Sequence, residues 1–322
     1  HMSSNEFAGS FAGVNATAFD RDAMLAGSSA SFIQFSLGTS TGVRSNFSLQ
    51  PSHLEGNATP PAGTCNKYIM AFDDQVWGTG GGSDGYRVWT FCTDFASPSS
   101  STFAETAFIN SVGFDAELCA YSRNCIPQPG TTQRLDTLGQ FTMYRFGTRY
   151  FPGTGLRGVI SHSVDSGGNV AGVRWAEIDV DNDALLDAGT LAPGDGVSRW
   201  MPSASMDSAG NIGLVFTKSS SSVRPSVYFT GREAGDSPGT LQGEVVCIDG
   251  TGSQLGGNRW GDYASVSVDP ADDCTFWVTN EYVETTGSFQ WDTQICSYSF
   301  ASCGGVTQEC GNDVIEGTEV CD

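Results

Sequence analysis

The chain has 322 residues, of which 16% are charged, 11% are aromatic and 41 are glycine. This length suffices for one large all-β domain or two smaller ones, and the abundance of glycine and aromatic residues favours sheets over helix bundles. The formal net charge of -21 repels phosphate backbones, so nucleic acid is not expected as a partner. Cations and neutral or basic ligands stay open, although solubility alone also explains the acidity.

The cysteine and histidine content points to disulfides rather than to metal. Ten cysteines include no paired CxxC motif and only three histidines are present, so a zinc site is not expected. Disulfides predict an oxidising compartment, hence a secreted or cell-surface location. No hydrophobic stretch approaches the roughly 20 residues that span a bilayer, so membrane insertion is not expected. His1-Met2 is typical of the remnant of a tag, and no secretory leader is recognisable.

Alternating apolar residues predict short β-strands along most of the chain. Two strands are expected within 13–25 and 31–38, and three within 67–77, 86–95 and 101–110. The next unit is expected within 134–140, 141–151, 156–165 and 170–180. Another lies within 199–207, 211–220, 224–232 and 241–250, and the last has three strands within 259–269, 274–283 and 292–300. The glycine-rich segment 78–85 predicts an exposed loop, because no helix pattern follows it.

Three segments share the pattern Ser-(Val/Met)-Asp, then a tight turn, then an alternating apolar strand. Their aspartates are Asp165, Asp207 and Asp269. The pattern predicts β-hairpins in which each carboxylate caps turn amides. The first hairpin is expected inside its unit and the other two at the start of theirs, so the three need not be equivalent.

An arginine followed by a large apolar residue recurs at Arg134, Arg199 and Arg259, with separations of 65 and 60 residues. A repeat of this size with about four strands is typical of a β-propeller blade. The sequence therefore predicts an all-β fold, a propeller of four-stranded blades with about five visible, in a complete or incomplete ring. A jelly roll or sandwich is the alternative.

The segment RWGDYASVSVDPADDCTFWVTNEY, which begins at Arg259, and the TQICSYSF after it resemble a family of uncharacterised secreted bacterial β-propeller proteins. The resemblance extends back through SRWMPSASMDSAGNIGLVFT, CIPQPGTTQRLDTLGQFTMYRF and AFDRDAML and covers nearly all of 6–303. It implies a propeller fold and export, and no particular reaction. Members of this family usually carry further blade sequence before AFDRDAML, where this chain has about half a blade.

The final residues, CGNDVIEGTEVCD from Cys310, resemble the start of the Cys-rich repeats of myxobacterial-type surface proteins. Such repeats usually continue, so this chain is expected to be part of a longer secreted or surface protein. The expected organisation is a disordered tag over 1–5, a β-propeller over 6–303, and the start of a Cys-rich repeat over 304–322.

Spacing predicts three local disulfides, which are Cys119–Cys125, Cys274–Cys303 and Cys310–Cys321. Cys65–Cys92 and Cys247–Cys296 are then left by elimination, although connectivity does not follow from sequence alone. Each bridge typically contributes about 2–4 kcal/mol to stability.

The three repeated arginines form the first candidate binding site. Equivalent places on three blades would point Arg134, Arg199 and Arg259 towards a central funnel, where their guanidinium groups would bind an anion. The alternative is a structural role, in which each arginine pairs with an aspartate of a neighbouring blade.

A group of aromatic and acidic residues forms the second candidate, a glycan site. Its members are Trp200, Trp260, Asp262, Tyr263 and Glu281. Aromatic faces stack on sugar rings and carboxylates bind hydroxyls. Asp262 and Glu281 would be the carboxylate pair if the protein is a glycoside hydrolase. Packing between blades explains the tryptophans equally well.

Calcium is the only cofactor that the sequence predicts. The segment DVDNDALLDAG places carboxylates at positions 1, 3, 5 and 9 of an EF-hand-like loop, and these are Asp179, Asp181, Asp183 and Asp187. Oxygen ligands at alternate residues suit a hard cation. A true EF-hand is not expected, because Ala184 and Thr190 replace its glycine and glutamate. A looser calcium loop and a solvated acidic turn are the two interpretations.

His162 lies between two serines. It is an acid–base candidate with Asp262, Glu281 and Tyr263 if the protein is a hydrolase or lyase, and otherwise a structural histidine. The leading hypothesis is a secreted or surface binding module for a glycan or an extracellular partner protein. Trp200, Trp260 and the arginines would form its contact face. The alternatives are a polysaccharide hydrolase or lyase and an architectural spacer, and the oligomeric state is not predicted.

Overall fold

The structure is a computed structural model that describes residues 1–139 and 141–304. It confirms the all-β prediction: the described residues form short β-strands, two short helices, α1 (Arg21–Leu25) and α2 (Asp74–Trp77), and a few 3-10 turns. No helix in the described part of the chain is long and apolar enough to cross a membrane.

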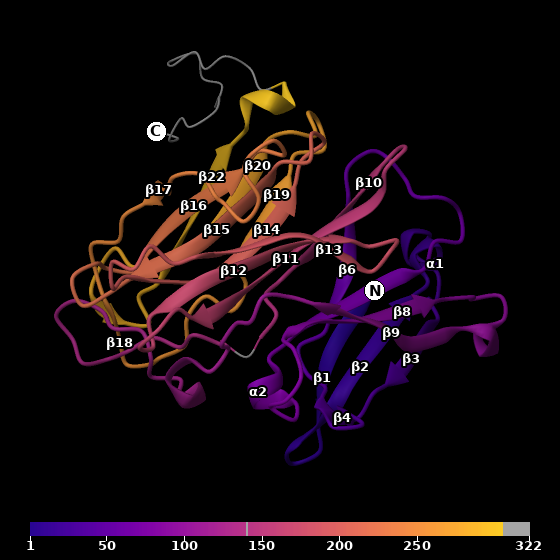
Figure 1. Ribbon diagram of the computed structural model, residues 1–322, viewed down its shortest axis with the longest axis horizontal. Coiled ribbons are helices and arrows are strands. Elements are labelled where there is room, and N and C mark those ends of the chain that lie inside the picture. Colours follow the sequence, from indigo (N-terminus) through magenta and orange to yellow (C-terminus); the bar gives the residue numbers. More distant parts are fainter. Residues whose placement is uncertain (140, 305–322) are drawn as a thin grey trace.

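Most strands belong to five antiparallel units that follow one another along the chain (Figure 1). The first is β1 (Met2–Phe7), β2 (Phe11–Phe19) and β3 (Phe32–Ser36). The second is β6 (Gln50–Glu55), β7 (Asn66–Phe72), β8 (Gly85–Cys92) and β9 (Thr102–Asn110). The third is β10 (Phe146–Phe151), β11 (Gly155–Asp165), β12 (Ala171–Asp179) and β13 (Ala184–Leu191).

The last two units complete the fold. The fourth is β14 (Ser198–Met206), β15 (Ile212–Ser219), β16 (Ser226–Arg232) and β17 (Val245–Ile248). The fifth is β19 (Ser265–Val268), β20 (Phe276–Tyr282) and β22 (Asp292–Tyr298). Two minor pairs are β4 (Ser40–Thr41) with β5 (Arg44–Ser45), and β18 (Gln254–Leu255) with β21 (Gly287–Ser288).

The first strands of successive units lie next to one another. β6 and β10 pair in parallel, which joins the second and third units into one curled eight-stranded sheet. β14 contacts β10, β11 and β19. In Figure 1 the magenta strands β11 to β13 accordingly lie between the purple strands and the orange ones. The first strands of four units thus lie side by side, in the order β6, β10, β14 and β19.

The expected strand pattern holds best in the second half of the chain. All four strands expected within 199–250 form the fourth unit, and the three expected within 259–300 form the fifth. The third unit differs, because residues 134–139 form no strand beyond an isolated bridge at Leu135 and the fourth strand is β13. β6, which the sequence analysis missed, completes the second unit with only two residues paired to β7.

The three Ser-(Val/Met)-Asp hairpins form as predicted. Asp165 Oδ1 accepts a hydrogen bond from Gly167 N–H at 2.8 Å, in the turn between β11 and β12. Asp207 Oδ1 accepts from the amides of residues 209 and 211, both at 2.9 Å, between β14 and β15. Asp269 Oδ1 accepts from Ala271 N–H at 2.8 Å between β19 and β20. Each carboxylate satisfies turn amides that the sheet leaves unpaired.

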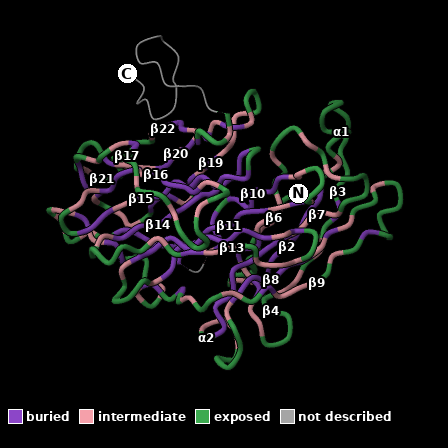
Figure 2. The backbone as a smooth tube through the Cα atoms, turned by 45° about the horizontal axis from the view of Figure 1, so that its top comes forward, coloured by how far each residue is buried: buried purple, intermediate pink, exposed green. Residues whose placement is uncertain are grey.

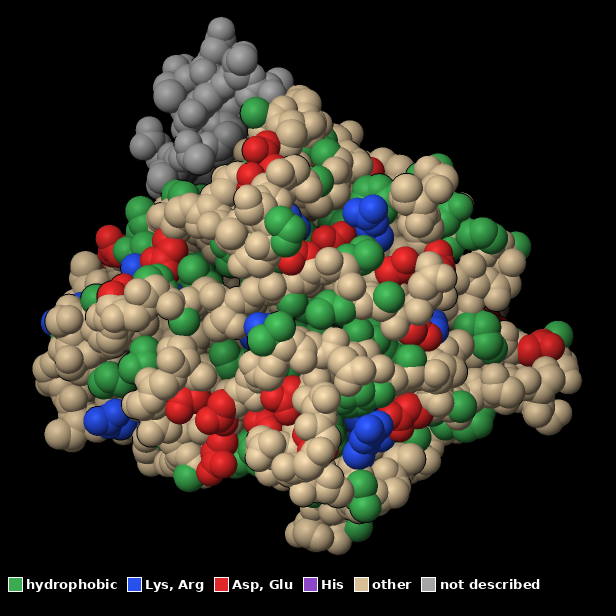
Figure 3. Space-filling view, viewed as in Figure 1, with side chains coloured by type: hydrophobic (Ala, Val, Ile, Leu, Met, Phe, Trp, Pro, Cys, Tyr) green, Lys and Arg blue, Asp and Glu red, His purple; other side chains and the backbone are tan. Residues whose placement is uncertain are grey.

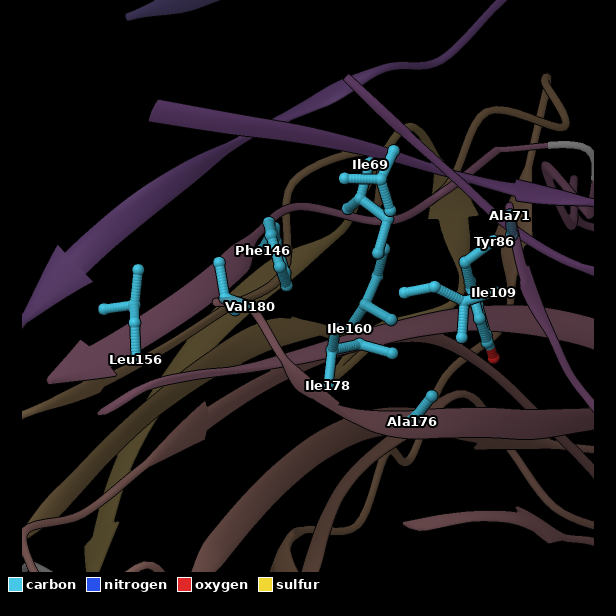
Figure 4. Packing of buried hydrophobic residues seen from close by; sticks show 11 residues of the cluster. Ile69, Ala71, Tyr86, Ile109, Phe146, Leu156, Ile160, Ala176, Ile178 and Val180 are labelled. Atoms are coloured by element: carbon cyan, nitrogen blue, oxygen red, sulfur yellow. The ribbon is translucent and has the colours of Figure 1, made fainter. Parts of the chain in front are cut away.

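Apolar side chains between units form the core, and the buried backbone runs through the sheet centres while exposed segments lie in connecting loops (Figure 2). In the cluster of Figure 4, Ile69 and Tyr86 of the second unit face Phe146 and Ile160 of the third. Because this cluster joins two units, each sheet buries its apolar face against its neighbour.

Four of the five predicted disulfides are confirmed. They are Cys65–Cys92, Cys119–Cys125, Cys247–Cys296 and Cys274–Cys303. The predicted Cys310–Cys321 bridge and the Cys-rich repeat over 304–322 lie, apart from Gly304, outside the described residues. Disulfides in this number are typical of proteins from oxidising compartments.

The first residues depart from the expectation that 1–5 are a disordered tag. Met2–Phe7 pair with β2 along the strand, from Met2 opposite Thr17 to Phe7 opposite Phe11. The Met2 carbonyl also accepts a hydrogen bond from the Tyr68 hydroxyl at 3.0 Å. The segment is ordered because it supplies the backbone partners that the edge of β2 would otherwise lack.

The glycine-rich segment 78–85 folds around a buried carboxylate. Gly82 N–H donates to Asp74 Oδ2 at 2.6 Å, and a Cβ at Gly78 would lie 2.1 Å from Asp74 Oδ1. Asp74 itself is only 6% exposed. A larger residue at position 78 would therefore force this carboxylate to move.

Candidate functional site

Trp200 and Trp260 lie in the core and not on a binding surface, which corrects their predicted role in stacking on sugar. Trp200 is fully buried and Trp260 is 2% exposed. The indole N–H of Trp200 donates to the Asp136 carbonyl at 3.0 Å, and that of Trp260 donates to Thr217 Oγ1 at 3.2 Å. Their polar atoms are thus satisfied inside the protein, as buried indoles require.

Arg199 is also internal. Its side chain is 2% exposed and forms ion pairs with Asp195, at 2.8 Å, and with Glu244. Lys218 Nζ lies 2.7 Å from the same Glu244. The hydrogen bonds from Arg199 lower the pKa of Asp195 below its usual range. Arg199 therefore neutralises carboxylates of its own unit.

The other two repeated arginines have different partners, so the three share none. Arg134 is exposed and donates from Nη1 to the Cys125 carbonyl at 2.8 Å. Arg259 has a side chain that is 57% exposed and pairs with Asp262. Of the three, Arg259 lines a pocket that holds other candidate residues as well.

That pocket has a volume of about 440 Å³, and we name it the Tyr263 pocket. It lies where β1, the start of β6, the segment 138–144 and the segment 259–263 meet. Its lining residues are His1, Met2, Ser3, Gln50, Pro51, Arg123, Leu138, Phe141, Thr142, Met143, Tyr144, Arg259, Asp262 and Tyr263. Three residues of the sequence prediction, Arg259, Asp262 and Tyr263, are thus brought together with side chains that the sequence analysis missed.

Two tyrosines give the Tyr263 pocket exposed aromatic faces. Tyr263 is 85% exposed, although it follows the buried Trp260 by only three residues, and Tyr144 is 43% exposed. Tyrosine carries an apolar ring with a hydroxyl, a combination that suits contact with amphipathic ligands. Tyr263 is too exposed to act as a core residue, so core packing does not explain an aromatic ring at this place.

Charged groups surround these rings. Asp262 Oδ2 pairs with Arg259, while Asp262 Oδ1 is buried and has no hydrogen-bond partner among the described residues. Arg123 Nη1 lies 3.2 Å from Asp136 Oδ2, and the Arg123 side chain is 48% exposed. The pocket therefore presents guanidinium donors and a carboxylate acceptor in one place, a pairing that can bind hydroxyls or a carboxylate.

Asp136 lies behind Arg123, at the base of this group. Burial raises the pKa of Asp136, although the Leu138 N–H and the charges of Arg123 and Arg259 act in the opposite direction. Asp136 is 2% exposed and is absent from the lining of the pocket. It supports the arginines and does not itself face the pocket.

The other two acid–base candidates do not line the Tyr263 pocket. Glu281 Oε2 accepts a hydrogen bond from Gly261 N–H at 2.9 Å, and burial raises the pKa of Glu281. Glu281 thus holds the backbone of the 259–263 segment from behind. His162 is 1% exposed, packs 4.8 Å from the Phe114 ring, and has its pKa lowered to about 3 by burial and by Arg174. This is the environment of a neutral core histidine.

The predicted calcium loop is a hairpin turn followed by strand β13. Asp179 accepts a hydrogen bond from Asn182 N–H at 3.0 Å, and Asp181 accepts one from Leu156 N–H at 2.8 Å. Asp183 lies 2.9 Å from Lys67 Nζ, and Asp187 lies 2.8 Å from Arg232 Nη1. Within 1–139 and 141–304, no three His, Cys, Asp or Glu side chains are grouped for a metal ion. Calcium binding by this segment stays a prediction. Figure 3 shows Asp and Glu side chains at many separate places on this face of the molecule.

A charged group that no sequence pattern marks lies where the first strands meet. Arg145, next to β10, lies 2.9 Å from Glu55 Oε1 of β6 and donates to the Val266 carbonyl of β19 at 2.8 Å. The Ser205 hydroxyl of β14 donates to the second oxygen of Glu55. Arg149 of β10 pairs with Asp273 at 2.7 Å. The arginines that converge between units are therefore Arg145 and Arg149, and no regular spacing marks them.

Comparisons with known proteins give only distant structural likenesses. No family model matches the chain, and no curated protein matches it. A protein of unknown function from Dyadobacter fermentans aligns with a TM-score of 0.38 at 10% identity, over 84% of this chain and 71% of that one. An α-L-arabinofuranosidase from Podospora anserina, in complex with cellotriose, gives 0.33 at 11% identity, over 79% and 64%. A thermostable family-43 glycoside hydrolase gives 0.27 at 9%, over 78% and 89%. These scores are too low to assign a fold family or an activity.

Proposed function

We propose that the protein is a secreted or cell-surface binding module of β-propeller type that holds a saccharide in the Tyr263 pocket. Support for the propeller architecture comes from the five consecutive antiparallel units and from the first strands of four of them meeting along one line. Support for secretion comes from the four disulfides. The proposal includes about five blades, in a ring that is either complete or incomplete.

The observation that carries the binding function is the exposure of Tyr263 beside Arg259 and Asp262. The ring is 85% exposed on the wall of a pocket of about 440 Å³, a volume in the range of small-ligand sites. Sugar rings stack on such a face through their C–H groups, while their hydroxyls bind the guanidinium and carboxylate beside it. Two arginines in the lining favour a sugar that carries a carboxylate, such as a uronate.

Direct binding tests this function. The labelled protein is applied to an array of neutral and uronate-containing oligosaccharides, and the dissociation constant of each hit is measured by calorimetry. Tyr263→Ala and Arg259→Ala should each weaken binding at least tenfold. Trp291→Ala is the matched control, because Trp291 is 50% exposed and does not line the pocket. Equal affinity of Tyr263→Ala and the wild type would refute the site, and capture of an extracellular protein instead of a glycan would replace the ligand class.

A polysaccharide-acting enzyme is the second candidate, and the Asp262 carboxylate in the lining of the pocket favours it. A glycoside hydrolase needs one carboxylic acid of raised pKa and one ionised carboxylate, which are about 5–9.5 Å apart on either side of the bond that breaks. Asp136 has the raised pKa, but only Asp262 lines the pocket. Release of reducing ends or of unsaturated products from an array hit, abolished by Asp262→Asn with binding retained, would establish the enzyme.

Calcium binding by Asp179, Asp181, Asp183 and Asp187 also stays a proposal of the sequence. Binding would require Asp183 to release Lys67 and Asp187 to release Arg232, since both ion pairs occupy carboxylate oxygens. The melting temperature in calcium chloride and in EGTA tests this. A higher value in calcium that Asp181→Asn removes would support the loop, and equal values would dismiss it.

A further inference from the structure

A second hollow shares part of its lining with the Tyr263 pocket. It has a volume of about 570 Å³ and lies around Trp77, so we name it the Trp77 hollow. Phe141 lines both spaces. β1 also runs past both, because Ser3 lines the first and Asn5 and Phe7 line the second. The pairing of β1 with β2 shifts register between Glu6 and Phe7, at the end of the strand that lines the second space.

Aromatic rings form the walls of the Trp77 hollow. The Trp77 ring stacks on Tyr121 with 6.4 Å between centroids, and Phe47 packs edge-on against Trp77 at 4.7 Å. Phe7, at the rim, is 70% exposed and lies 5.9 Å from Phe11. These rings come from separate segments that the fold brings together. Phe7 is exposed, while Phe47, Trp77 and Tyr121 are half-buried and line the hollow. Aromatic side chains at a hollow are typical of a ligand site.

The polar groups of this hollow are uncharged, although the chain carries a net charge of -21. Asn5, Thr39 and Ser40 are exposed and line it, and its lining among the described residues includes no Asp, Glu, Lys or Arg. Aromatic faces with amide and hydroxyl groups suit neutral sugar rings, whose C–H faces stack while their hydroxyls hydrogen-bond. The Tyr263 pocket, by contrast, is lined by Arg123, Arg259 and Asp262.

We propose that the Trp77 hollow is a further subsite of the Tyr263 pocket, and that the two together bind a linear oligosaccharide several units long. This inference rests on the proposed saccharide-binding function and adds the length of its ligand. Each space is in the range that holds one small ligand, and Phe141 is common to both. Two subsites on one chain act at high effective concentration, so affinity rises with ligand length once both are filled.

The experiment compares short and long probes on matched variants. Oligogalacturonates and cello-oligosaccharides of two and six units are titrated into the wild type, Phe7→Ala, Tyr263→Ala and Phe32→Ala. Phe7→Ala leaves the fold intact because the side chain is 70% exposed. Phe32 is the control, since it is 62% exposed in the same sheet and lines neither space.

We expect at least one six-unit probe to bind ten times more tightly than its two-unit form. Phe7→Ala should remove that gain and leave the two-unit affinity unchanged, while Tyr263→Ala weakens both and Phe32→Ala weakens neither. Unchanged six-unit affinity in Phe7→Ala, with Tyr263→Ala still impaired, overturns the second subsite and leaves the proposed function standing. Absence of binding by all four probes and by the wider array removes the proposed function itself. Binding of a proline-rich peptide that only Phe7→Ala weakens would make the Trp77 hollow a peptide site and overturn the inference.

Discussion

Arg145 and Glu55 form an ion pair where the first strands of four units meet, with 2.9 Å between Arg145 Nη1 and Glu55 Oε1. Both side chains are 8% exposed, and they link β6 to β14 and β19 through Ser205 and Val266. Arg145→Met leaves Glu55 buried without its cation, and breaking such a pair costs about 3–5 kcal/mol. We expect the free energy of unfolding, measured in urea at pH 7, to fall by this amount. The double variant Arg145→Met/Glu55→Gln should recover part of it, and an unchanged free energy of unfolding would contradict the structural role.

Trp260 and Tyr263 should behave in opposite ways, although they are neighbours in sequence. Trp260→Ala empties a core site that Trp200 shares, with 6.3 Å between the two ring centroids, and should cost about 3–5 kcal/mol. Tyr263→Ala removes an exposed ring and should change stability by less than about 0.5 kcal/mol. Chemical denaturation of both variants measures this. Similar stabilities would mean that Trp260 is not a core residue.

Substitution of Arg199 should lower stability, whereas substitution of Arg259 should weaken ligand binding. Arg199→Met removes a buried cation, but Glu244 keeps Lys218 and Asp195 is 43% exposed, so the loss should be about 1–2 kcal/mol, with ligand affinity unchanged. Arg259→Met should weaken ligand binding and leave the free energy of unfolding nearly constant, because its side chain is 57% exposed. Calorimetric titration with any oligosaccharide that the array identifies, together with denaturation, checks both. Loss of ligand affinity in Arg199→Met would mean that Arg199 takes part in ligand binding.

The disulfides should differ in their contribution to stability. Cys247–Cys296 joins residues 49 apart and Cys119–Cys125 joins residues 6 apart. Loop-closure entropy predicts losses of about 4 and about 2 kcal/mol when each pair is replaced by alanine. Thermal and urea unfolding of the two double variants test this order. A larger loss for the short loop would show that the bridge acts on the folded state and not through chain entropy.

His162 should make the fold sensitive to acid. Burial lowers its pKa to about 3, whereas the unfolded chain has a value of about 6.5. Between these values the unfolded state binds a proton that the folded state does not, so stability falls as the pH falls below 6.5. By pH 4.5 this loss is roughly 2–3 kcal/mol. The free energy of unfolding at pH 7 and 4.5 should therefore decrease more in the wild type than in His162→Gln, and equal decreases would contradict the assignment. His53 has a lowered pKa as well, but contributes equally to both proteins.

Local pattern predicted the elements of the second half of the chain well. The Asp165, Asp207 and Asp269 turns formed as expected, because an aspartate that caps its own turn depends only on residues within four positions. The segment 179–187 shows the limit of such patterns. Its alternating carboxylates resemble metal ligands, but the strand pairing of β12 with β13 and the distant partners Lys67 and Arg232 determine where they point.

The candidate site could be predicted only in part. Arg259, Asp262 and Tyr263 are adjacent in sequence, so a single segment brought them to the pocket together. Arg123 and Tyr144 come from distant segments with no distinctive pattern. For Trp200 and Trp260 the sequence leaves ligand contact and core packing open, because a large aromatic ring suits both, and exposure alone distinguishes the two.

The sequence by itself determined the all-β class, the approximate strands, the capped turns and the two local disulfides Cys119–Cys125 and Cys274–Cys303, since these depend on local periodicity and on cysteine spacing. Only the tertiary structure decided that Trp260 faces the core while Tyr263 faces solvent, and that Arg145 instead of Arg199 joins the units. The physical reason is that burial and ion pairing depend on which surfaces of separate sheets meet, and contacts between residues 60 to 120 positions apart leave no signature in a single sequence.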